Sequence, residues 1–376
     1  MSRAVFWISL FMIAYAYFGY PLVLYLIRSG RGSEIRKYSS DREFTPTISM
    51  LMPAHNEEGT IEAKIRNTFS LEYPRKNLQI VVVSDGSTDA TNAIVRKYLD
   101  ERITFVVLET RGGKAKALNA GLAKATGEII VFSDASILLE AAALRNIVKR
   151  FREEYIGCVS GEDHIKDGGG EGFYGRYELY LRNLESAVYS IVGASGSFYA
   201  QRRLICIPFQ EGMAPDFLSV LETIEKGYRA VTEPSAFGTM SSASKAKDEF
   251  RRKERTILRG MTTLYYKKSL LNPFRYGIFS LSLFSHKLMR WLVPFFMIFL
   301  FVSNAFLVEE RYYSIPFLFQ VVFYFVACVS LFGTGENRSI FSKVPHYFCV
   351  SNAAILMATI KFLMGVRQEI WTPTKR

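Results

Sequence analysis

The pattern of hydrophobic and polar positions divides the chain into a first half with short apolar runs and a last third with long ones. The short runs cover residues 48–52, 78–83 and 129–132, are rich in Val and Ile, and each end in a polar cluster. Short apolar runs flanked by turn residues are typical of buried strands in a parallel sheet. Ligands bind such sheets where the carboxyl ends of the strands open into loops, so the polar clusters are candidates for a binding site.

Segments with a helical pattern alternate with these runs from about residue 46 to residue 233. We expect helices at residues 57–70, 89–99, 114–125, 140–151 and 174–189. Strands followed by helices, repeated along the chain, predict an α/β domain with a mostly parallel sheet. The glycine-rich residues 167–170 are expected to form a flexible loop.

An uncharged apolar run covers residues 4–27 and exceeds the roughly 20 residues that cross a bilayer. The run lacks the small-residue cleavage site of a secretory signal. Basic residues follow it: Arg28, Arg31, Arg36, Lys37 and Arg42. The positive-inside rule places this flank in the cytoplasm and the amino terminus outside. A helix buried in a protein core is the alternative, which the length and the basic flank disfavour.

The last third of the chain contains further long apolar runs. Residues 292–308 and 314–332 are apolar enough to span a membrane, whereas residues 346–366 are a weaker candidate because Asn352 and Lys361 interrupt them. If all three segments span, the basic tail lies outside, which the positive-inside rule disfavours. The number of crossings therefore stays open, and a re-entrant or interfacial segment is the alternative.

Residues 276–291 mix aromatic side chains with His286, Lys287 and Arg290, a composition typical of a helix that lies in the membrane interface. The short and long apolar runs together predict how the whole chain is divided into parts. The expected parts are an N-terminal transmembrane anchor at 1–30, the α/β domain at 44–260, an interfacial amphipathic region at 261–291, transmembrane helices at 292–366 and a tail at 367–376.

Composition narrows the class of protein. Aromatic residues make up 14% of the chain, which favours contact with membrane lipid. The formal charge of +12 fits nucleic acid, anionic lipid or a phosphate-bearing substrate as a partner. Nucleic acid is disfavoured because the sequence has no RNA-binding signature and no basic arm interleaved with aromatics. The four cysteines lack the spacing of a zinc site or a disulfide framework.

Charged residues after the apolar runs suit a nucleotide that carries phosphate. Glu57 and Asp85 follow the first two runs and could accept hydrogen bonds from a base or a ribose. Lys114 opens a predicted helix after a glycine turn, where an ammonium and a helix amino terminus both favour phosphate. Asp134 follows the third run and could hold Mg²⁺ or Mn²⁺ against a diphosphate. Taken alone, Glu57 and Asp85 are better explained as caps and Lys114 as a surface charge, while Asp134 is equally well explained as a turn residue. Their shared sheet edge favours a site.

Six segments carry a resemblance to a known family. They read PAHNEE (53–58), DGSTD (85–89), GGKAKALNAGL (112–122), GEIIVFSDAS (127–136), GASGSFYAQRR (193–203) and APDFLSVLETIEKGYRA (214–230). As a set they resemble the membrane-bound family 2 glycosyltransferases of the GT-A type, the group that includes cellulose, chitin and hyaluronan synthases. The resemblance covers residues 46–260. It implies a GT-A domain, a nucleotide-sugar donor that is expected to be a UDP-sugar, a divalent cation (Mg²⁺ or Mn²⁺), and an acceptor-side loop at 193–203.

The resemblance also implies roles for particular residues on the donor side. Ala54, Glu57 and Asp85 match positions that bind the nucleotide. Asp134 matches the first acid of the metal-binding DxD motif. Ser136 stands where the second acid is usual, and a hydroxyl is a weaker metal ligand than a carboxylate.

On the acceptor side, Asp216 lies at the spacing of the acid in the family's TED motif, which acts as the general base. Pro215 replaces the usual acidic neighbour, and a helix cap is the alternative role for Asp216. Processive members carry a QxxRW motif further along the chain. Arg255 matches its arginine, which would contact the diphosphate, while Arg252 and Thr256 replace the Gln and the Trp. A basic face against anionic lipid is the alternative for this segment.

The leading interpretation is an inverting glycosyltransferase integral to the inner or plasma membrane, with its catalytic domain in the cytoplasm. The resemblance implies transfer of a sugar, through a β-linkage, to a lipid-linked or polysaccharide acceptor in exopolysaccharide or envelope glycan synthesis. Thr256 in place of Trp favours single transfer over processive synthesis. The alternative is a non-catalytic domain that senses nucleotide sugars or scaffolds a polysaccharide complex, which Ser136 and Pro215 favour. A transporter would need more spanning helices than the chain supplies.

Overall fold

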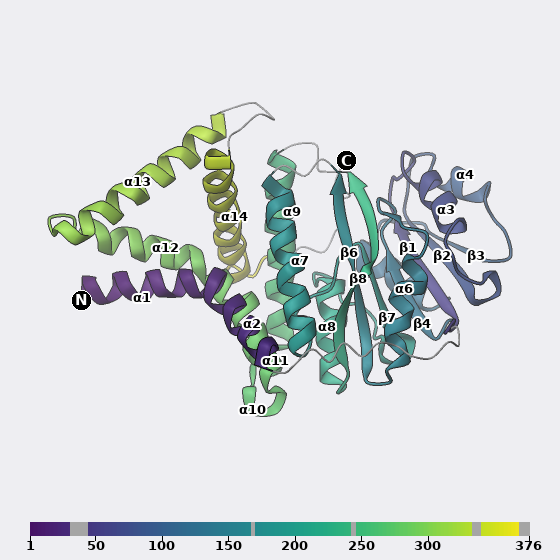
Figure 1. Cartoon of the computed structure of the whole chain (residues 1–376). Coiled ribbons are helices and arrows are strands. Elements are labelled where there is room, and N and C mark those ends of the chain that lie inside the picture. The colour runs from purple at the N-terminus through teal and green to yellow at the C-terminus, as the bar shows by residue number, and fades with distance from the viewer. Residues whose placement is uncertain (31–43, 167–169, 242–245, 333–339, 368–376) are drawn as a thin grey trace.

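The computed structural model describes residues 1–30, 44–166, 170–241, 246–332 and 340–367. Figure 1 shows an α/β domain on one side and a group of apolar helices on the other, with the N-terminus far from the sheet. The predicted glycine-rich loop lies outside the described residues except for Gly170, which begins a helix. Most of the basic flank after the first apolar run and nearly all of the predicted tail also lie outside them.

Within the described residues, one mixed sheet of eight strands forms the centre of the domain. The strands are β1 (Ile48–Ala54), β2 (Leu78–Asp85), β3 (Ile103–Leu108), β4 (Ile129–Ser133), β5 (Leu138–Leu139), β6 (Ile156–Lys166), β7 (Phe198–Arg202) and β8 (Arg229–Ser241). Their order is β3-β2-β1-β4-β7-β6-β8-β5. The three short apolar runs form β1, β2 and β4, as predicted, and these strands are parallel. Their carboxyl ends therefore reach the same edge of the sheet.

Helices cover both faces of this sheet (Figure 1). The helices of the domain are α3 (Ile61–Phe69), α4 (Thr91–Arg96), α5 (Lys114–Leu122), α6 (Ala143–Lys149), α7 (Gly170–Val188), α8 (Pro215–Glu225) and α9 (Ala246–Tyr266). The structure confirms the predicted helices as α3 to α7, with different ends. For example, α3 begins later than predicted because residues 57–60 form a turn, in which the Thr60 and Ile61 N–H groups donate to the Glu57 carbonyl.

Alternate residues of each central strand pack into two separate apolar cores. Met50 and Met52 of β1 lie in the core that α3 and α6 cover. Leu51 lies in the other core, with residues of α5 and α8. This second core also contains Phe279 and Leu283, which come from a later helix and are fully buried. The apolar helices at the end of the chain are therefore anchored in the second core.

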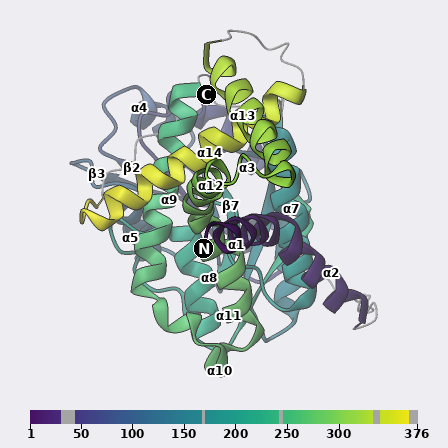
Figure 2. The ribbon, with the colours of Figure 1, turned by 90° about the vertical axis from the view of Figure 1, so that its left-hand side faces the viewer.

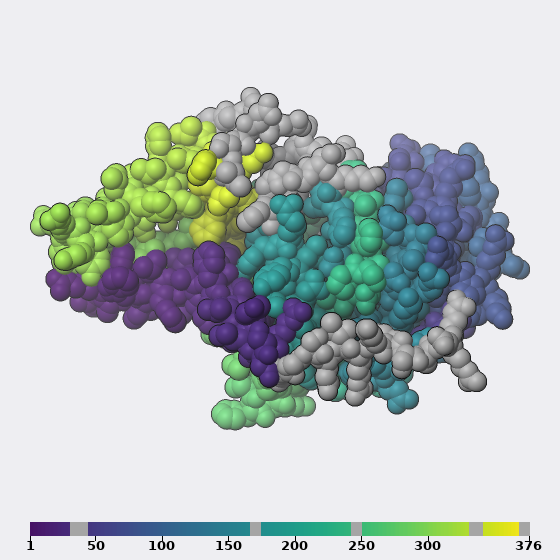
Figure 3. Space-filling view, in the orientation of Figure 1, coloured from purple at the N-terminus to yellow at the C-terminus, as the bar shows by residue number. Residues whose placement is uncertain are grey.

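The remaining helices lie beside the domain. They are α1 (Ser2–Ala14), α2 (Tyr20–Gly30), α10 (Pro273–Tyr276), α11 (Ile278–Leu283), α12 (Met289–Ala305), α13 (Arg311–Phe332) and α14 (Ile340–Leu363). Among them, α1, α12 and α13 form an arm that projects from the domain (Figures 1 and 3). Two π-helical turns, Tyr15–Gly19 and Phe284–Leu288, join α1 to α2 and α11 to α12. Among the described residues, four helices are long and apolar enough to cross a membrane: Ser2–Gly30, Ile278–Ala305, Arg311–Ser330 and Phe341–Leu363.

The segment that was expected to form a separate interfacial helix, residues 276–291, is continuous with the helix that follows it. Ile278–Ala305 is one helix, because residues 278–293 contain neither Gly nor Pro to interrupt it. The expected division at residue 291 therefore falls inside a helix. The two parts still differ in their surroundings: the first packs into the domain core, whereas exposed apolar side chains such as Ile298, Phe299 and Phe306 occur in or just after the second.

α14 lies across the arm and against the domain. In Figure 2, α1 is seen nearly end-on, while α14 is seen from the side. α14 packs on α9, a helix rich in charged residues. Lys253 of α9 donates to Ser351 Oγ at 3.2 Å and lies 3.4 Å from the ring centroid of Tyr347, and Glu254 pairs with Lys361.

A buried cluster of charged groups joins α7 to the apolar arm. Glu185 accepts a hydrogen bond from Tyr20 of α2 at 2.8 Å, and His286 Nδ1 lies 2.6 Å from the same carboxylate oxygen. Glu178 pairs with Arg290 of α12, and its second oxygen lies 3.2 Å from His286 Nε2. Buried charges are tolerated only with partners, so this cluster fixes α2 and α12 in one position against α7.

We expect Arg290→Met to destabilise the protein by about 3–5 kcal/mol, because it leaves the Glu178 carboxylate without its strongest buried partner. The measurement is thermal unfolding of the full chain in detergent. Arg3→Met is the matched control, since it breaks the exposed pair between Arg3 and Glu310, and exposed pairs contribute about 0–1 kcal/mol. Equal melting temperatures for the two variants would contradict this role of the cluster.

Candidate active site

The loops that follow β1 and β2 are tied together by hydrogen bonds. Asn56, which has a positive φ of 53°, accepts from the Thr88 N–H at 2.8 Å through its side-chain oxygen. The Glu57 N–H donates to Thr91 Oγ1 at 2.8 Å. These bonds hold the half-buried Glu57 side chain at the carboxyl edge of the sheet. Ala54, the last residue of β1, is fully buried behind it.

Asp85, at the end of β2, shapes the turn that leads to Lys114. Its two carboxylate oxygens accept hydrogen bonds from the N–H groups of Gly112 at 2.7 Å and Gly113 at 2.8 Å. The side chain is buried, with Asp85 only 1% exposed. A Cβ at Gly86 would lie 2.6 Å from the Arg111 nitrogen, so glycine is required there for the turn to approach. The structure therefore gives Asp85 a role in positioning this turn, and its direct contact with a nucleotide stays a prediction.

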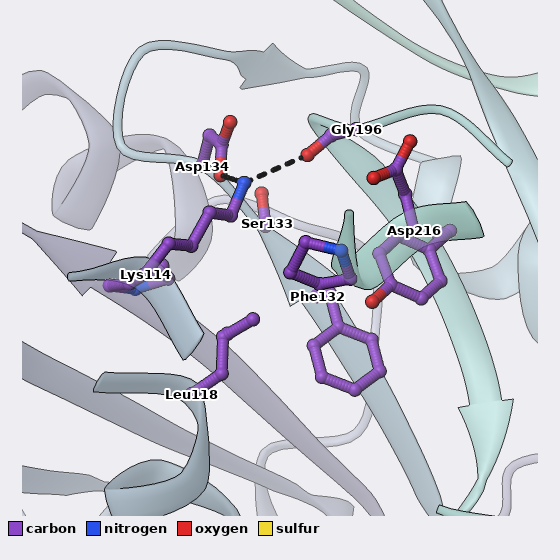
Figure 4. A pocket seen from close by; sticks show the side chains of 10 residues that line it. Lys114, Leu118, Phe132, Ser133, Asp134, Gly196 and Asp216 are labelled. Carbon is purple, nitrogen blue, oxygen red and sulfur yellow. Dashed lines mark hydrogen bonds and ion pairs between the residues drawn. The ribbon is translucent and has the colours of Figure 1, made fainter. Parts of the chain in front are cut away.

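Lys114, Asp134 and the loop at 193–197 meet at the same edge (Figure 4). Lys114 is the first residue of α5, and its Nζ lies 2.6 Å from Asp134 Oδ1 and donates to the Gly196 carbonyl at 3.1 Å. Asp134 directly follows β4, and its N–H donates to the Ser197 carbonyl at 3.0 Å. Ser136, two residues later, is half-buried. The donor-side residues predicted from the sequence are thus brought to one edge of the sheet.

Asp216 lies in the same pocket as Lys114 and Asp134 (Figure 4). It is in the first turn of α8, after Pro215, and a methyl group built on Gly196 would lie 3.7 Å from Asp216 Oδ2. The Gly196 loop therefore contacts the lysine on one side and approaches this carboxylate on the other. The structure brings the predicted base and the predicted donor-side residues together, as the sequence predicted.

α9 contains three arginines on one side of the helix, and one of them, Arg259, lies near enough to Asp216 for their charges to interact. Arg252, Arg255 and Arg259 are spaced by three and four residues, which places them on one side of the helix. Burial and the neighbouring charge of Arg255 lower the pKa of Arg259 to about 10, whereas Asp216 raises it. Burial and Arg252 lower the pKa of Arg255. Arg255 and Arg252 were predicted, but Arg259 was missed, although its spacing from Arg255 on a helix would have indicated it.

Lys64 is a second residue that the motifs did not reveal. This lysine of α3 is fully buried, and its Nζ donates to Ser133 Oγ at 2.7 Å and to the Ile137 carbonyl at 2.8 Å. It therefore joins both ends of the turn that contains Asp134 and Ser136. Burial lowers the pKa of Lys64 to about 7, and the charge of Asp134 partly opposes that shift.

The residues present fit a divalent cation that is shared with a substrate. Among the described residues, no group of three or more His, Cys, Asp or Glu could form an all-protein metal site. Mg²⁺ and Mn²⁺ do not need one, because Mg²⁺ is commonly held by one or two carboxylates together with substrate phosphates and waters. Asp134, with the Ser136 hydroxyl nearby in sequence, would supply the protein ligands.

Comparison with known proteins agrees with this geometry. Residues 49–205 match the family model described as Glycosyl transferase family 2. The chain is 33% identical over 138 residues to "Probable glycosyltransferase YdaM" of Bacillus subtilis, covering 35% of this chain and 33% of that protein. It is 32% identical over 130 residues to a poly-beta-1,6-N-acetyl-D-glucosamine synthase of Staphylococcus epidermidis, covering 34% of this chain and 31% of that one. The matches thus span about a third of these relatives.

A solved structure shares the fold over nearly the whole chain. It is the mannosyltransferase PcManGT from Pyrobaculum calidifontis, in complex with GDP-Man and Mn²⁺. The two chains are 24% identical, the match covers 97% of this chain and 99% of that one, and the TM-score is 0.71. This likeness extends beyond the matched domain to the apolar helices.

Lys64→Met is expected to flatten the dependence of stability on pH. Between pH 7 and 10.5 the unfolded chain holds a proton on Lys64 that the folded chain does not, so the stability of the wild type rises with pH in this window. The slope is at most about 1.4 kcal/mol per pH unit. Melting temperatures of the two proteins at pH 7, 8 and 9 measure the difference, with the exposed Lys124→Met as control. If both variants follow the wild-type curve, Lys64 does not titrate in this range.

Proposed function

Because the chain contains a glycosyl transferase family 2 domain, we propose that it transfers a sugar from a nucleotide sugar to an acceptor hydroxyl, with inversion at the anomeric carbon. The observation that carries the proposal is the pocket that Lys114, Asp134 and Asp216 share (Figure 4). Lys114 would bind the diphosphate, and Asp216 would accept the proton of the acceptor. The loop at Gly196 lies between these two side chains.

In the proposed reaction, Asp216 accepts the proton of the acceptor hydroxyl while that oxygen attacks the anomeric carbon. The bond from this carbon to the diphosphate oxygen breaks, and the diphosphate leaves with the electron pair. Lys114 and Arg255 stabilise the negative charge that develops on it. A divalent cation held by Asp134 would supply further positive charge at the diphosphate. Asp85 fixes the turn that places Lys114, and its contact with the nucleotide is part of the same proposal.

For the donor we propose a UDP-sugar, and for the acceptor a lipid-linked sugar or a growing glycan. The relatives named as poly-beta-1,6-N-acetyl-D-glucosamine synthases support an N-acetylhexosamine as one sugar to test, and the complex of the mannosyltransferase with GDP-Man supports a GDP-sugar as another. Thr256, where processive members carry Trp, supports the transfer of a single sugar.

We also propose that the catalytic domain lies on the cytoplasmic side and that α14 lies along the membrane surface instead of crossing the bilayer. α14 packs on the charged helix α9, and the Glu254–Lys361 pair and the Lys253–Ser351 bond join the two. Charged groups of this kind are costly within the hydrocarbon core. With α14 at the surface, the first helix, α12 and α13 make an odd number of crossings, and the basic tail returns to the cytoplasm, as the positive-inside rule favours.

Release of nucleoside diphosphate by the detergent-purified chain tests the reaction. We expect release from one member of a panel of UDP- and GDP-sugars with Mg²⁺ or Mn²⁺, in the presence of membrane extract as acceptor source. Asp216→Asn should lower kcat by about 100-fold or more, because the general base is lost, with little change in donor affinity. Asp100→Asn, at an exposed pair with Arg102, is the control. Tight donor binding with no turnover would instead support a nucleotide-sugar sensor.

Removal of the metal tests the role of Asp134 in the same assay. Chelation by EDTA is expected to abolish release, and Mn²⁺ should restore it. Asp134→Asn should raise the metal concentration for half-maximal activity by about 10-fold or more, because a carboxylate binds Mg²⁺ and Mn²⁺ better than an amide. Activity that EDTA leaves unchanged would contradict a metal at Asp134.

Reporter fusions at the C-terminus test the topology. We expect a C-terminal green fluorescent protein to fluoresce and a C-terminal alkaline phosphatase to be inactive in bacterial cells, since both would lie in the cytoplasm. Fusions after residue 308, between α12 and α13, should give the opposite result. An active phosphatase at the C-terminus would show that α14 crosses the membrane.

A further inference from the structure

Lys287 lies where the apolar arm meets the catalytic domain. It belongs to the π-helical turn Phe284–Leu288, which leads from α11, packed in the domain core, into α12. Its ammonium lies 5.3 Å from the centre of the Phe217 ring, and Phe217 directly follows the proposed base. A methyl group built on Gly193 would lie 3.6 Å from Lys287 Nζ. The side chain thus points from the membrane helix toward the catalytic pocket.

One short loop connects this lysine to the rest of the site. In residues 193–197, the Gly196 carbonyl binds Lys114, the Gly196 Cα faces the Asp216 carboxylate, and Gly193 faces Lys287. Gly196, at one end of the loop, is therefore next to Lys114 and Asp216. Gly193, at the other end, is next to Lys287.

Three carboxylates act on Lys287 through their charge: Glu178, Asp216 and Glu185. Asp216 is the proposed base, and the other two have closer partners. Glu178 pairs with Arg290 and His286, and Glu185 binds Tyr20 and His286. Within the described part of the chain, no carboxylate or carbonyl oxygen lies within hydrogen-bond distance of Lys287 Nζ. A half-buried ammonium is stabilised best by a direct anionic partner, and the ring of Phe217 replaces one only in part.

We propose that Lys287 binds the phosphate or diphosphate group of a lipid-linked acceptor. This inference rests on the proposed function and names the acceptor class for the same site. The lipid chain would lie against the exposed apolar side chains of the arm, such as Leu292 and Phe299 of the same helix. The phosphate would reside at the end of α12 next to the domain, and the sugar hydroxyl would reach Asp216. Basic groups between membrane helices bind lipid phosphates in this way.

The test measures binding, which requires no turnover. The purified full-length chain is titrated with a long-chain isoprenyl phosphate and with the corresponding isoprenyl alcohol. We expect the wild type to bind the phosphate about 10-fold more tightly than the alcohol. Lys287→Gln should remove that preference, Lys287→Arg should retain it, and the exposed Lys268→Gln should leave it unchanged. Inorganic phosphate at millimolar concentration should compete weakly, since it lacks the lipid chain.

Gly193→Val gives a second variant that keeps every charge. Its added methyl groups would fill the space beside Lys287 Nζ, so phosphate preference should fall several-fold even though the lysine is intact. Binding of the nucleotide-sugar donor is measured in parallel and should be unchanged in Lys287→Gln and in Gly193→Val.

Equal affinity of the wild type for phosphate and alcohol, or full preference in Lys287→Gln, would overturn the proposal and assign Lys287 to charge balance within the arm. Competition by inorganic phosphate as strong as that by the lipid would assign the site to free phosphate. Failure of the proposed transfer reaction would appear separately, as an absence of nucleoside diphosphate release while this phosphate preference persists.

Discussion

The buried carboxylates of α7 constrain the position of the whole membrane arm. Glu178 and Glu185 are paired with His286, Arg290 and Tyr20, and these partners come from α2 and from the helix Ile278–Ala305. Apolar packing alone would allow the helices to slide, because lipid and protein interior are similarly apolar. The charge pairs prevent such sliding, because each pair requires its two side chains to stay in contact. They set one rotation of the helix around the π-helical turn, and that rotation decides where the neighbouring side chains point.

The strands could be predicted where burial is complete and the pairing is parallel. β1, β2 and β4 are covered on both faces by the two apolar cores, so they appear in the sequence as nearly uninterrupted apolar runs. The long strands β6 and β8 contain Ser, Glu, Thr and His. β6 pairs with β7 and β8, and β8 also pairs with the short strand β5. Their polar residues hide the alternation, and no local pattern indicates partners that the chain reaches much later.

The site residues could also be predicted only where the fold class determines their position. Lys114, Asp134 and Asp216 could be placed together because each begins or ends an element whose position the fold class dictates. Lys64 and Lys287 could not, because a single lysine in a helix usually extends into solvent. The helical periodicity of α3 does indicate that Lys64 is buried, because Lys64 lies between Ile61 and Ile65 on the buried face. No local pattern marks Lys287, whose direction depends on tertiary contacts of the arm.

The arm and the pocket are connected through the loop at 193–197, and this connection explains why one chain contains both. A nucleotide sugar is water-soluble, whereas a lipid-linked acceptor is confined to the bilayer, so the reacting groups must meet at the boundary between them. The loop contacts Lys114 on the sheet side and approaches Lys287 on the membrane side, with Asp216 between. Because His286 and Arg290 flank Lys287 in sequence, the same buried charges that attach the arm also aim this lysine at the loop. Attachment of the apolar helices and the position of Lys287 are thus consequences of one set of contacts, and the proposed lipid-linked acceptor would depend on both.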